Sequence, residues 1–543
     1  MGSRVLRTLF LVPLLVGLAP RAKAQAFRVQ CPTTTSMHPA PGATSPTAAP
    51  YTGPVTLADS ATGLPFRSNG GQIKCQQVSG GDGYATMADG TQIYLFAFGP
   101  LSGLANIAAG QPGTVTPDVF NQVYPGNLQV GDPAASDTSW VLGGTGGLGS
   151  FTYNGAVGLA PDVDNGNAID GHVDPRPIMD VGTMNGNIPA PLLAIDEDDE
   201  FFLTLTNVGM LMRPDLFEQH TIHFHGYPNA SSFYDGVPDA SVAINIGGSM
   251  SYYYLAPDAG TYFWHCHITP PEHLQMGMVG QLYVRPRQNR VPAGQSLWAS
   301  LAGGSGLLHA NILGQQSDPR TAANCANDIL CTTPLPPYNT ATHSTNKSGV
   351  PTLYAYNDGD GSTAYDVEYP LQIHGFDPNF HFVGMTFNPE DFAGMKDKYF
   401  LLNGRSYPDT VQPGPLETPS SDGTNHFSQP LPSIINIPAG GRALLRISDL
   451  DVTEYQTLAS MGIPMQVIAL NARLLRDQAG TNLYYNTNSI TLAGGESLDV
   501  ILDASDTTKY PSGSTYYLYT PNLDHLSNDA ENFGGLMTEI HIN

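Results

Sequence analysis

Two His-x-His pairs restrict the fold of this chain more than any other feature of its sequence. His223 and His225 lie in HTIHFHG, and His265 and His267 lie in FWHCH, on either side of Cys266. Both motifs sit in strand-like runs, and side chains two residues apart in a strand share a face while the residue between them points to the other face. Two neighbouring strands would therefore present four imidazoles on one side and the thiol on the other.

The side that carries the thiol also offers a full set of metal ligands. His220 precedes the first pair and joins the Cys266 side if the strand continues that far, and His273 and Met278 follow in HCHITPPEHLQMGM. Two imidazoles, a thiolate and a weak axial thioether form a blue-copper electron-transfer site, because soft sulfur selects copper. Met276 competes for the axial position, and zinc bound by Cys and His, or histidines without a metal, are the alternatives. We expect copper.

The composition favours strands over helices. The 543 residues include 59 Gly and 45 Pro, long helical patterns are scarce, and short apolar runs such as EFFLTLTNV and STYYLYTP recur between turns. This pattern predicts an all-β protein with β-sandwich domains at 86–285 and 371–543 and Gly/Pro-rich insertions. We expect an N-terminal extension at 25–85 and a linker or capping segment at 286–370.

The start of the chain predicts export. A basic beginning, an apolar run and a small-residue site ending at Ala24 are typical of a secretory signal peptide, here residues 1–24, so the protein is expected in the periplasm or outside the cell. No other stretch approaches the length of a membrane span. The formal charge of −25 argues against nucleic acid as a partner, because a phosphate backbone would be repelled.

Four cysteines lie outside the metal-like motif. In an oxidising compartment such cysteines form disulfides. Sequence alone does not fix their connectivity, but we expect these two bonds: Cys325 with Cys331, which closes the short loop CANDILC, and Cys31 with Cys75.

The motifs together resemble those of the multicopper oxidases of the laccase class, a family built from repeated cupredoxin domains. The resemblance is close over residues 185–285, through HFHG, YDGVP and GTYFWHCH, and looser in the C-terminal half, through LLNGRSYPD and IPAGGRALLRISD. It implies two cupredoxin-like Greek-key domains, copper as the cofactor, a small molecule or metal ion as the electron donor and O2 as the acceptor.

The resemblance also implies a role for each residue of the motifs. The type 1 copper ligands would be His220, Cys266, His273 and Met278. Half of the ligands of a trinuclear type 2/type 3 cluster would be His223, His225, His265 and His267. Electrons would be taken up through His273, expected near the surface, and would pass along the Cys266 backbone. Asp235 in YDGVP matches an acidic residue that helps deliver protons to the cluster, although a turn Asp before Gly explains it equally well.

Two features depart from the family pattern. His273 follows Cys266 by seven residues instead of the usual five, because Thr269–Glu272 lengthen the loop. A full cluster needs four His-x-His pairs, whereas this chain has two. The histidines of the C-terminal half are not paired in this way: His374, His381, His426, His525 and His541.

Three arrangements could complete the site. Two chains could join their four-histidine faces in a homo-oligomer. A smaller type 2 site similar to that of copper nitrite reductases could use His225, His265 and a histidine such as His525 of a neighbouring chain. The irregularly spaced histidines of the C-terminal half could also fill the cluster within one chain. The alternatives to an oxidase are accordingly a nitrite-reductase-like two-copper enzyme and a non-enzymatic blue-copper electron carrier.

Overall fold

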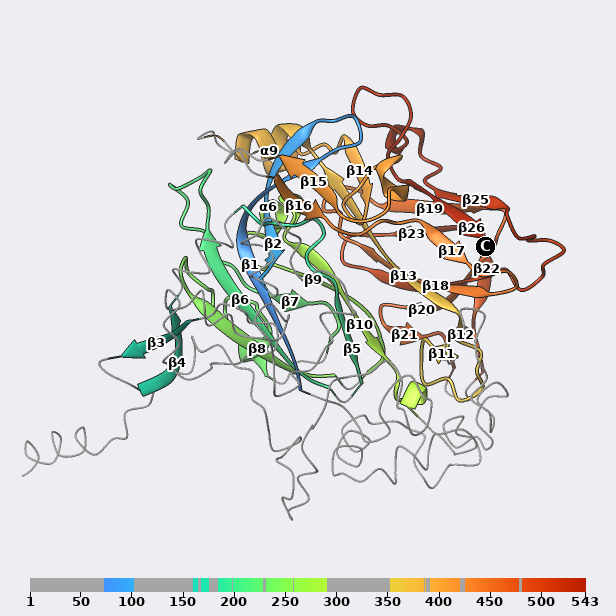
Figure 1. Cartoon of the computed structure of the whole chain (residues 1–543), viewed down its shortest axis with the longest axis horizontal. Coiled ribbons are helices and arrows are strands. Elements are labelled where there is room, and N and C mark those ends of the chain that lie inside the picture. The colour runs from blue at the N-terminus through green and yellow to red at the C-terminus, as the bar shows by residue number, and fades with distance from the viewer. Residues whose placement is uncertain are drawn as a thin grey trace, which may run out of the picture.

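The structure is a computed structural model that describes residues 73–101, 160–174, 184–290 and 352–543, with short gaps inside these ranges. Two β-sandwiches lie side by side, the first drawn in blue to green and the second in yellow to red (Figure 1). The predicted signal peptide and the Cys325–Cys331 pair fall outside the described residues, as do Cys31 and the side chain of Cys75.

The first sandwich consists of two four-stranded sheets. One sheet has the order β2 (Gln92–Pro100), β1 (Ile73–Thr86), β6 (Glu200–Gly209) and β8 (Ser249–Leu255), and the other has the order β5 (Leu193–Asp196), β10 (Val279–Arg285), β9 (Gly260–His265) and β7 (His223–Phe224). Phe98, Leu203 and Tyr252 of the first sheet pack with Trp264 and Leu282 of the second in one buried apolar core. Strands β6 and β9 are buried along their whole length, so both of their faces are covered.

Strand β1 lies deeper in the fold than the sequence predicted. We expected residues 25–85 to be an extension, but β1 is an internal strand that pairs antiparallel with β2 and parallel with β6. The prediction was wrong at its C-terminal end because QQVSGGDGY lacks the apolar alternation of a half-buried strand. The register with β6 shifts between Gly80 and Gly81.

The second sandwich is larger. Its first sheet has the order β14 (Tyr399–Leu402), β13 (Val367–Phe376), β18 (Arg442–Asp449), β24 (Ser497–Asp503), β20 (Met465–Leu470) and β21 (Arg473–Leu474), with β22 (Tyr485–Thr487) beside β20. Its second sheet has the order β17 (Ile435–Ile437), β26 (Met537–Ile542), β25 (Thr515–Tyr519), β19 (Gln456–Met461) and β23 (Ser489–Leu492). The all-β prediction is confirmed.

Short elements connect and cover the sandwiches. The remaining strands are β3 (Ala160–Asp164), β4 (Ala168–Asp174), β11 (Leu353–Tyr354), β12 (Ala364–Tyr365), β15 (Leu416–Pro419) and β16 (Asn425–Gln429). The helices are α6 (Pro270–Gln275), α9 (Pro378–Gly384), η1 (Ser232–Tyr234), η2 (Arg287–Arg290), η6 (Phe392–Gly394), η7 (Asp409–Val411) and η8 (Leu523–His525). Within the described residues, none of the helices is long and apolar enough to cross a membrane.

A buried ionic network joins the two sandwiches. Glu368 of β13 accepts hydrogen bonds from Arg285 of β10 at 2.5 Å and from Arg446 of β18 at 3.1 Å. Thr261 of β9 donates to Asp499 of β24 at 2.5 Å. Burial disfavours the Glu368 carboxylate, but the two guanidinium groups outweigh this effect and lower the pKa of Glu368 to about 2. The metal-motif strands β9 and β10 are thus fixed against the second sandwich.

Candidate metal centre

The pairing of β7 with β9 brings the two His-x-His motifs side by side. The strands are antiparallel, with His223 directly opposite His265 and Phe224 opposite Trp264. Phe224 and Trp264 point into the apolar core, so His223 and His225, which flank Phe224, and His265, which follows Trp264, point away from it. The structure therefore separates the thiol and the paired imidazoles as the spacing predicted.

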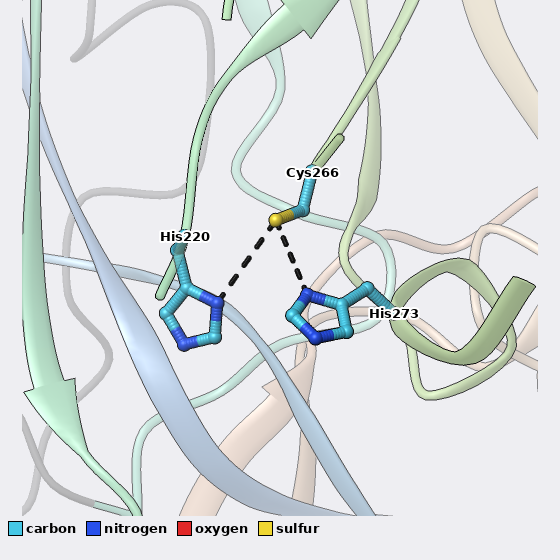
Figure 2. Close-up of side chains that lie close together, drawn as sticks. All are labelled: His220, Cys266 and His273. Atoms are coloured by element: carbon cyan, nitrogen blue, oxygen red, sulfur yellow. Dashed lines mark hydrogen bonds between the residues drawn. The ribbon is translucent and has the colours of Figure 1, made fainter. Parts of the chain in front are cut away.

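A first group of ligand atoms lies inside the first sandwich. The Cys266 Sγ is 3.2 Å from the Nδ1 of His273 and 4.0 Å from the Nδ1 of His220 (Figure 2). All three side chains have zero exposed area. The nitrogen and sulfur atoms lie within 4.8 Å of one another, which is close enough to bind one metal ion.

Backbone hydrogen bonds fix this group. Cys266 N–H donates to the carbonyl of Met278, and Met278 N–H donates to the carbonyl of His273, so the three residues of the ligand loop are tied together. On the other side, His220 and Ile244 exchange two backbone hydrogen bonds. The Thr221 amide points at the Cys266 sulfur at 3.4 Å.

Met278, rather than Met276, lies beside the ligand group. A Cβ atom placed on Gly80 would lie 2.6 Å from a ring carbon of His220 and 3.2 Å from the methyl group of Met278, so both side chains face the same point of β1. A Cβ on Gly384 of α9 would lie 3.3 Å from the sulfur of Met276. Met276 thus packs against the second sandwich, and Met278 is the better candidate for an axial ligand.

The electrostatics of the group suit a bound cation. Burial opposes ionisation of the Cys266 thiol, but His273 and nearby backbone amides outweigh it and hold the pKa of Cys266 below its ordinary value. Burial also opposes a charge on His273, yet the Cys266 sulfur and Glu218 raise the pKa of His273 to about 10. Burial lowers the pKa of His220 to about 3, which keeps this imidazole neutral. A metal ion would replace the proton held between sulfur and imidazole.

His273 is buried, contrary to the expectation that it would lie near the surface. Its Nε2 is 3.4 Å from a carboxylate oxygen of Glu218, and the side chain of Glu218 is 23% exposed. The loop that carries Glu218 covers the imidazole, and the interaction with His273 lowers the pKa of Glu218. Solvent therefore meets Glu218 before it meets His273. The sequence offered no spacing signal for this carboxylate.

A second group consists of the paired imidazoles. Ligand atoms of His223, His225 and His265 lie within 4.8 Å of one another, and the Nε2 atoms of His225 and His265 are 3.0 Å apart. The ring of His267 is 5.0 Å from that of His223, centre to centre. The four predicted residues are thus together.

Carbonyl oxygens orient three of these rings. The Nδ1 of His223 donates to the carbonyl of Asp235 at 2.7 Å, that of His225 to Gly495 at 3.2 Å, and that of His265 to Cys266 at 2.6 Å. Because a carbonyl can only accept, Nδ1 carries the proton in each ring and Nε2 keeps a lone pair for a metal. Burial lowers the pKa of all three imidazoles, that of His265 well below its ordinary value.

Asp235 also contacts the histidine group through its side chain. Its carboxylate oxygen is 3.6 Å from the Nδ1 of His223, and the carboxyl side chain is 29% exposed. Asp235 follows the short helix η1, and its backbone N–H donates to the carbonyl of Ser232 and so closes the turn. The carboxylate therefore lies beside this imidazole and is partly open to solvent.

Four histidines of the C-terminal half have partners of their own. His374 binds the Leu274 carbonyl, His381 the Tyr94 carbonyl, His525 binds Gln456 and Glu454, and His541 binds Glu539. These bonds direct the four rings to partners outside the group of paired imidazoles. The second sandwich instead meets the paired imidazoles through the backbone of Gly495, where a Cβ would lie 2.7 Å from the ring of His225.

The described strands form two β-sandwiches, and the two groups of Cys and His atoms fit a copper site. Residues 169–289 match the family model described as multicopper oxidase, and this range holds every residue of both groups. This part of the chain is therefore similar to multicopper oxidases, as the sequence motifs indicated.

Known relatives match short stretches of the chain. Over 109 residues the chain is 34% identical to laccase abr2 of Aspergillus fumigatus, an alignment that covers 20% of this chain and 17% of the relative. Over 111 residues it is 34% identical to a copper-containing nitrite reductase of Rhizobium meliloti, covering 20% of this chain and 26% of the relative. The chain thus spans about a quarter or less of these relatives. A solved blue copper oxidase of Nitrosomonas europaea is 17% identical, with a TM-score of 0.46, and the match covers 86% of this chain and 85% of that one.

Proposed function

We propose that this protein is an exported, copper-dependent oxidoreductase of the multicopper oxidase type. It would take single electrons from a reducing substrate at a type 1 copper held by His220, Cys266, His273 and Met278, and pass them to O2 at a copper cluster held in part by His223, His225, His265 and His267. The observation that carries this proposal is the position of Cys266. Its sulfur belongs to one ligand group, and the residues bonded to it on both sides belong to the other.

The donor atoms fit copper better than zinc. Zinc sites close with four Cys, His or carboxylate ligands. Here the buried group has two imidazoles, one thiol of lowered pKa and a thioether next to it. Copper bound in such surroundings would supply one-electron redox chemistry, and at the imidazole group it would supply the place where O2 takes up electrons.

Two short links join the ligand groups. The first is covalent, from the Cys266 side chain through its own backbone to His265, whose Nδ1 is also hydrogen-bonded to the Cys266 carbonyl. The second runs through Thr221, whose amide points at the Cys266 sulfur and whose hydroxyl accepts a hydrogen bond from the His267 amide at 2.9 Å. These bonds hold the two groups at a fixed separation, as electron transfer between them requires.

Glu218 is the group that a reducing substrate would meet first. It covers His273, and the side chain of the preceding residue, Phe217, is 83% exposed. A carboxylate beside apolar surface suits a phenol, through a hydrogen bond to its hydroxyl, or a reduced metal ion, through its charge. Asp235 would hold or release a proton beside His223, since its carboxylate is 3.6 Å from that ring.

We also propose that a second copy of the chain completes the cluster. His225 is exposed, and in the described part of the second sandwich His374, His381, His525 and His541 hydrogen-bond groups outside the paired imidazoles. A homo-oligomer would supply further ligands to the exposed side.

The proposal is tested by exchanging both His223 and His225 for Ala. Oxygen uptake with a phenol or ferrous iron should be lost, because the cluster ligands are gone, whereas the blue absorption should remain because the Cys266 group is on the other side of β9. Oxygen uptake equal to that of the unchanged protein would contradict the proposal.

A nitrite-reductase-like enzyme is the second candidate. It is favoured by the tight group of three imidazoles, which could hold a single copper, and by the similarity to a copper-containing nitrite reductase. Turnover of nitrite without oxygen uptake would support this candidate. A blue protein with neither activity would be an electron carrier.

A further inference from the structure

We propose that the second sandwich positions the blue-copper ligand His273 by clamping the end of helix α6, with His374 and Asp397 as the positioning residues. None of the predicted copper ligands comes from the second sandwich, so this would be its contribution to the site. The inference rests on the proposed function of the Cys266 group and goes beyond it, because it concerns residues that touch no metal.

The clamped segment lies between two ligands. Residues 274–277 separate His273 from Met278, and Leu274, Gln275 and Met276 contact residues of the second sandwich or of α9. The Nε2 of His374 donates to the Leu274 carbonyl at 2.9 Å, and the side chain of Leu274 packs in an apolar cluster with Phe376 and Leu401. Any movement of this segment would therefore move both His273 and Met278.

The amide of Gln275 is held at both ends. Its Nε2 donates to Asp397 at 3.0 Å, and its oxygen accepts from the Asp377 amide at 2.9 Å. Asp377 in turn accepts hydrogen bonds from the amides of Asn379 and Phe380 at the start of α9. Gln275 is thus bound to the beginning of α9.

Met276 and Gly277 complete the contact. A Cβ on Gly384 would lie 3.3 Å from the Met276 sulfur, and a Cβ on Gly277 would lie 3.4 Å from Ala97 of β2 and 4.0 Å from Phe376 of β13, between the two sandwiches. Met276, which does not lie beside the Cys266 group, therefore packs between α6 and α9 and links them.

Helix α6 needs this support. It has six residues, and isolated helices of that length are unstable. Its N-cap, Thr269, lies in the left-handed region at φ 36°, and its side chain makes no capping hydrogen bond. The lengthened spacing between Cys266 and His273 thus gives a weak helix, and bonds from the second sandwich stabilise it.

His374 is suited to this task. It is 1% exposed at the end of β13, and because the Leu274 carbonyl can only accept, Nε2 carries the proton. Burial lowers the pKa of His374, which keeps the ring neutral. Without this ring the Leu274 carbonyl would lose its partner, and α6 would be free to shift relative to the Cys266 sulfur.

The test uses the full-length, copper-loaded protein and three variants: His374→Leu, His374→Gln and His525→Leu. His374→Leu removes the donor, whereas the amide of His374→Gln can still reach the Leu274 carbonyl. His525 is the matched control, a buried histidine of the same sandwich that hydrogen-bonds Gln456 and Glu454 instead of α6. The measurements are the blue absorption band, the copper hyperfine splitting in electron paramagnetic resonance, and the rate of copper release to a chelator.

We expect His374→Leu to shift the band and the hyperfine splitting and to release copper at least about tenfold faster, as losses of supporting hydrogen bonds do at other metal sites. His374→Gln should have the spectrum and the copper release rate of the unchanged protein, and so should His525→Leu. A spectrum and release rate of His374→Leu equal to those of His525→Leu would overturn the inference.

If His374→Leu does not fold, Gln275→Leu carries the same test, because it removes the bonds to Asp397 and Asp377. An unchanged protein that binds no blue copper would contradict the proposed function itself. A blue protein with an indifferent His374→Leu or Gln275→Leu variant would contradict only the clamp.

Discussion

His265 donates a hydrogen bond from its Nδ1 to the carbonyl of Cys266, the next residue, at 2.6 Å. The bond turns the ring so that Nε2 faces the other imidazoles, 3.0 Å from the Nε2 of His225. The sulfur of the same Cys266 points the opposite way, into the buried group. One dipeptide thus belongs to two ligand groups, and each group can be altered separately.

Exchange of His265 for Ala should remove copper from the imidazole group only. The blue band should persist, because Cys266, His220 and His273 are untouched, while oxygen uptake should be lost, because a direct ligand of the imidazole group is gone. The measurements are copper content, visible absorption and oxygen uptake. His541→Ala, on the surface beside Glu539, is the control. Loss of the blue band in His265→Ala would show that the groups are not separable.

Exchange of Cys266 for Ser should abolish the blue colour while the protein stays folded. The hydroxyl nearly matches the thiol in size but is a hard ligand that disfavours copper relative to thiolate. Visible absorption and circular dichroism of the copper-loaded variant check this result. A blue band in this variant would exclude the assigned cysteine ligand.

Exchange of Glu218 for Gln should raise the reduction potential of the blue site. The carboxylate lies 3.4 Å from His273 and favours the more positive, oxidised metal, so its neutralisation favours the reduced form. A redox titration followed by the blue band measures the shift. Glu454→Gln, which removes a similar carboxylate beside His525, is the matched control. An equal potential in both variants would mean that Glu218 does not act on the site.

Exchange of Gly80 for Ala should disturb the blue site directly. The added methyl group would lie 2.6 Å from the ring of His220 and 3.2 Å from Met278, so one of them must move. Overpacking of this kind costs about 1–3 kcal/mol of stability. Chemical unfolding of the metal-free protein measures the cost, and the hyperfine splitting of the copper form reports the ligand shift. Stability and splitting equal to those of the unchanged protein would contradict the close packing of β1 on the site.

Acid should weaken the contact between the two sandwiches, because it protonates Glu368 and removes its ion pairs with Arg285 and Arg446. Its pKa is lowered from 4.5 to about 2 by Arg285 and Arg446, so the stabilisation is fully present above about pH 4.5 and is lost as the pH falls through about 2. A shift of this size corresponds to about 3 kcal/mol. The free energy of unfolding, measured at a series of pH values from about 6 down to about 2, should fall as the pH falls. In Glu368→Gln this pH dependence should be weaker. An equally steep dependence in the variant would assign the effect to other carboxyl groups.

The sequence predicted the ligand groups better than their surroundings. The period of two along a strand was enough to place His223 and His225 on one side and to set Cys266 apart from His265, because side-chain direction in a strand follows from local geometry. The all-β class followed from turn residues and short apolar runs in the same way.

Contacts between distant segments could not be read from the sequence. The carbonyl of Gly495, the carboxylate of Glu218 and the ring of His374 reach the site through tertiary packing, and their local sequences carry no spacing pattern. Strand β1 was missed for a related reason, since Gly80 is selected by close approach of His220 and not by strand propensity.

The most direct test of the account is the copper content per chain of the purified, copper-loaded protein, compared with the number of unpaired spins in electron paramagnetic resonance. A blue site together with an oxygen-reducing cluster predicts copper well in excess of the spins, because a coupled copper pair is silent. Copper equal to the spins, at one or two per chain, would contradict the multicopper oxidase account and favour a nitrite-reductase-like enzyme or an electron carrier.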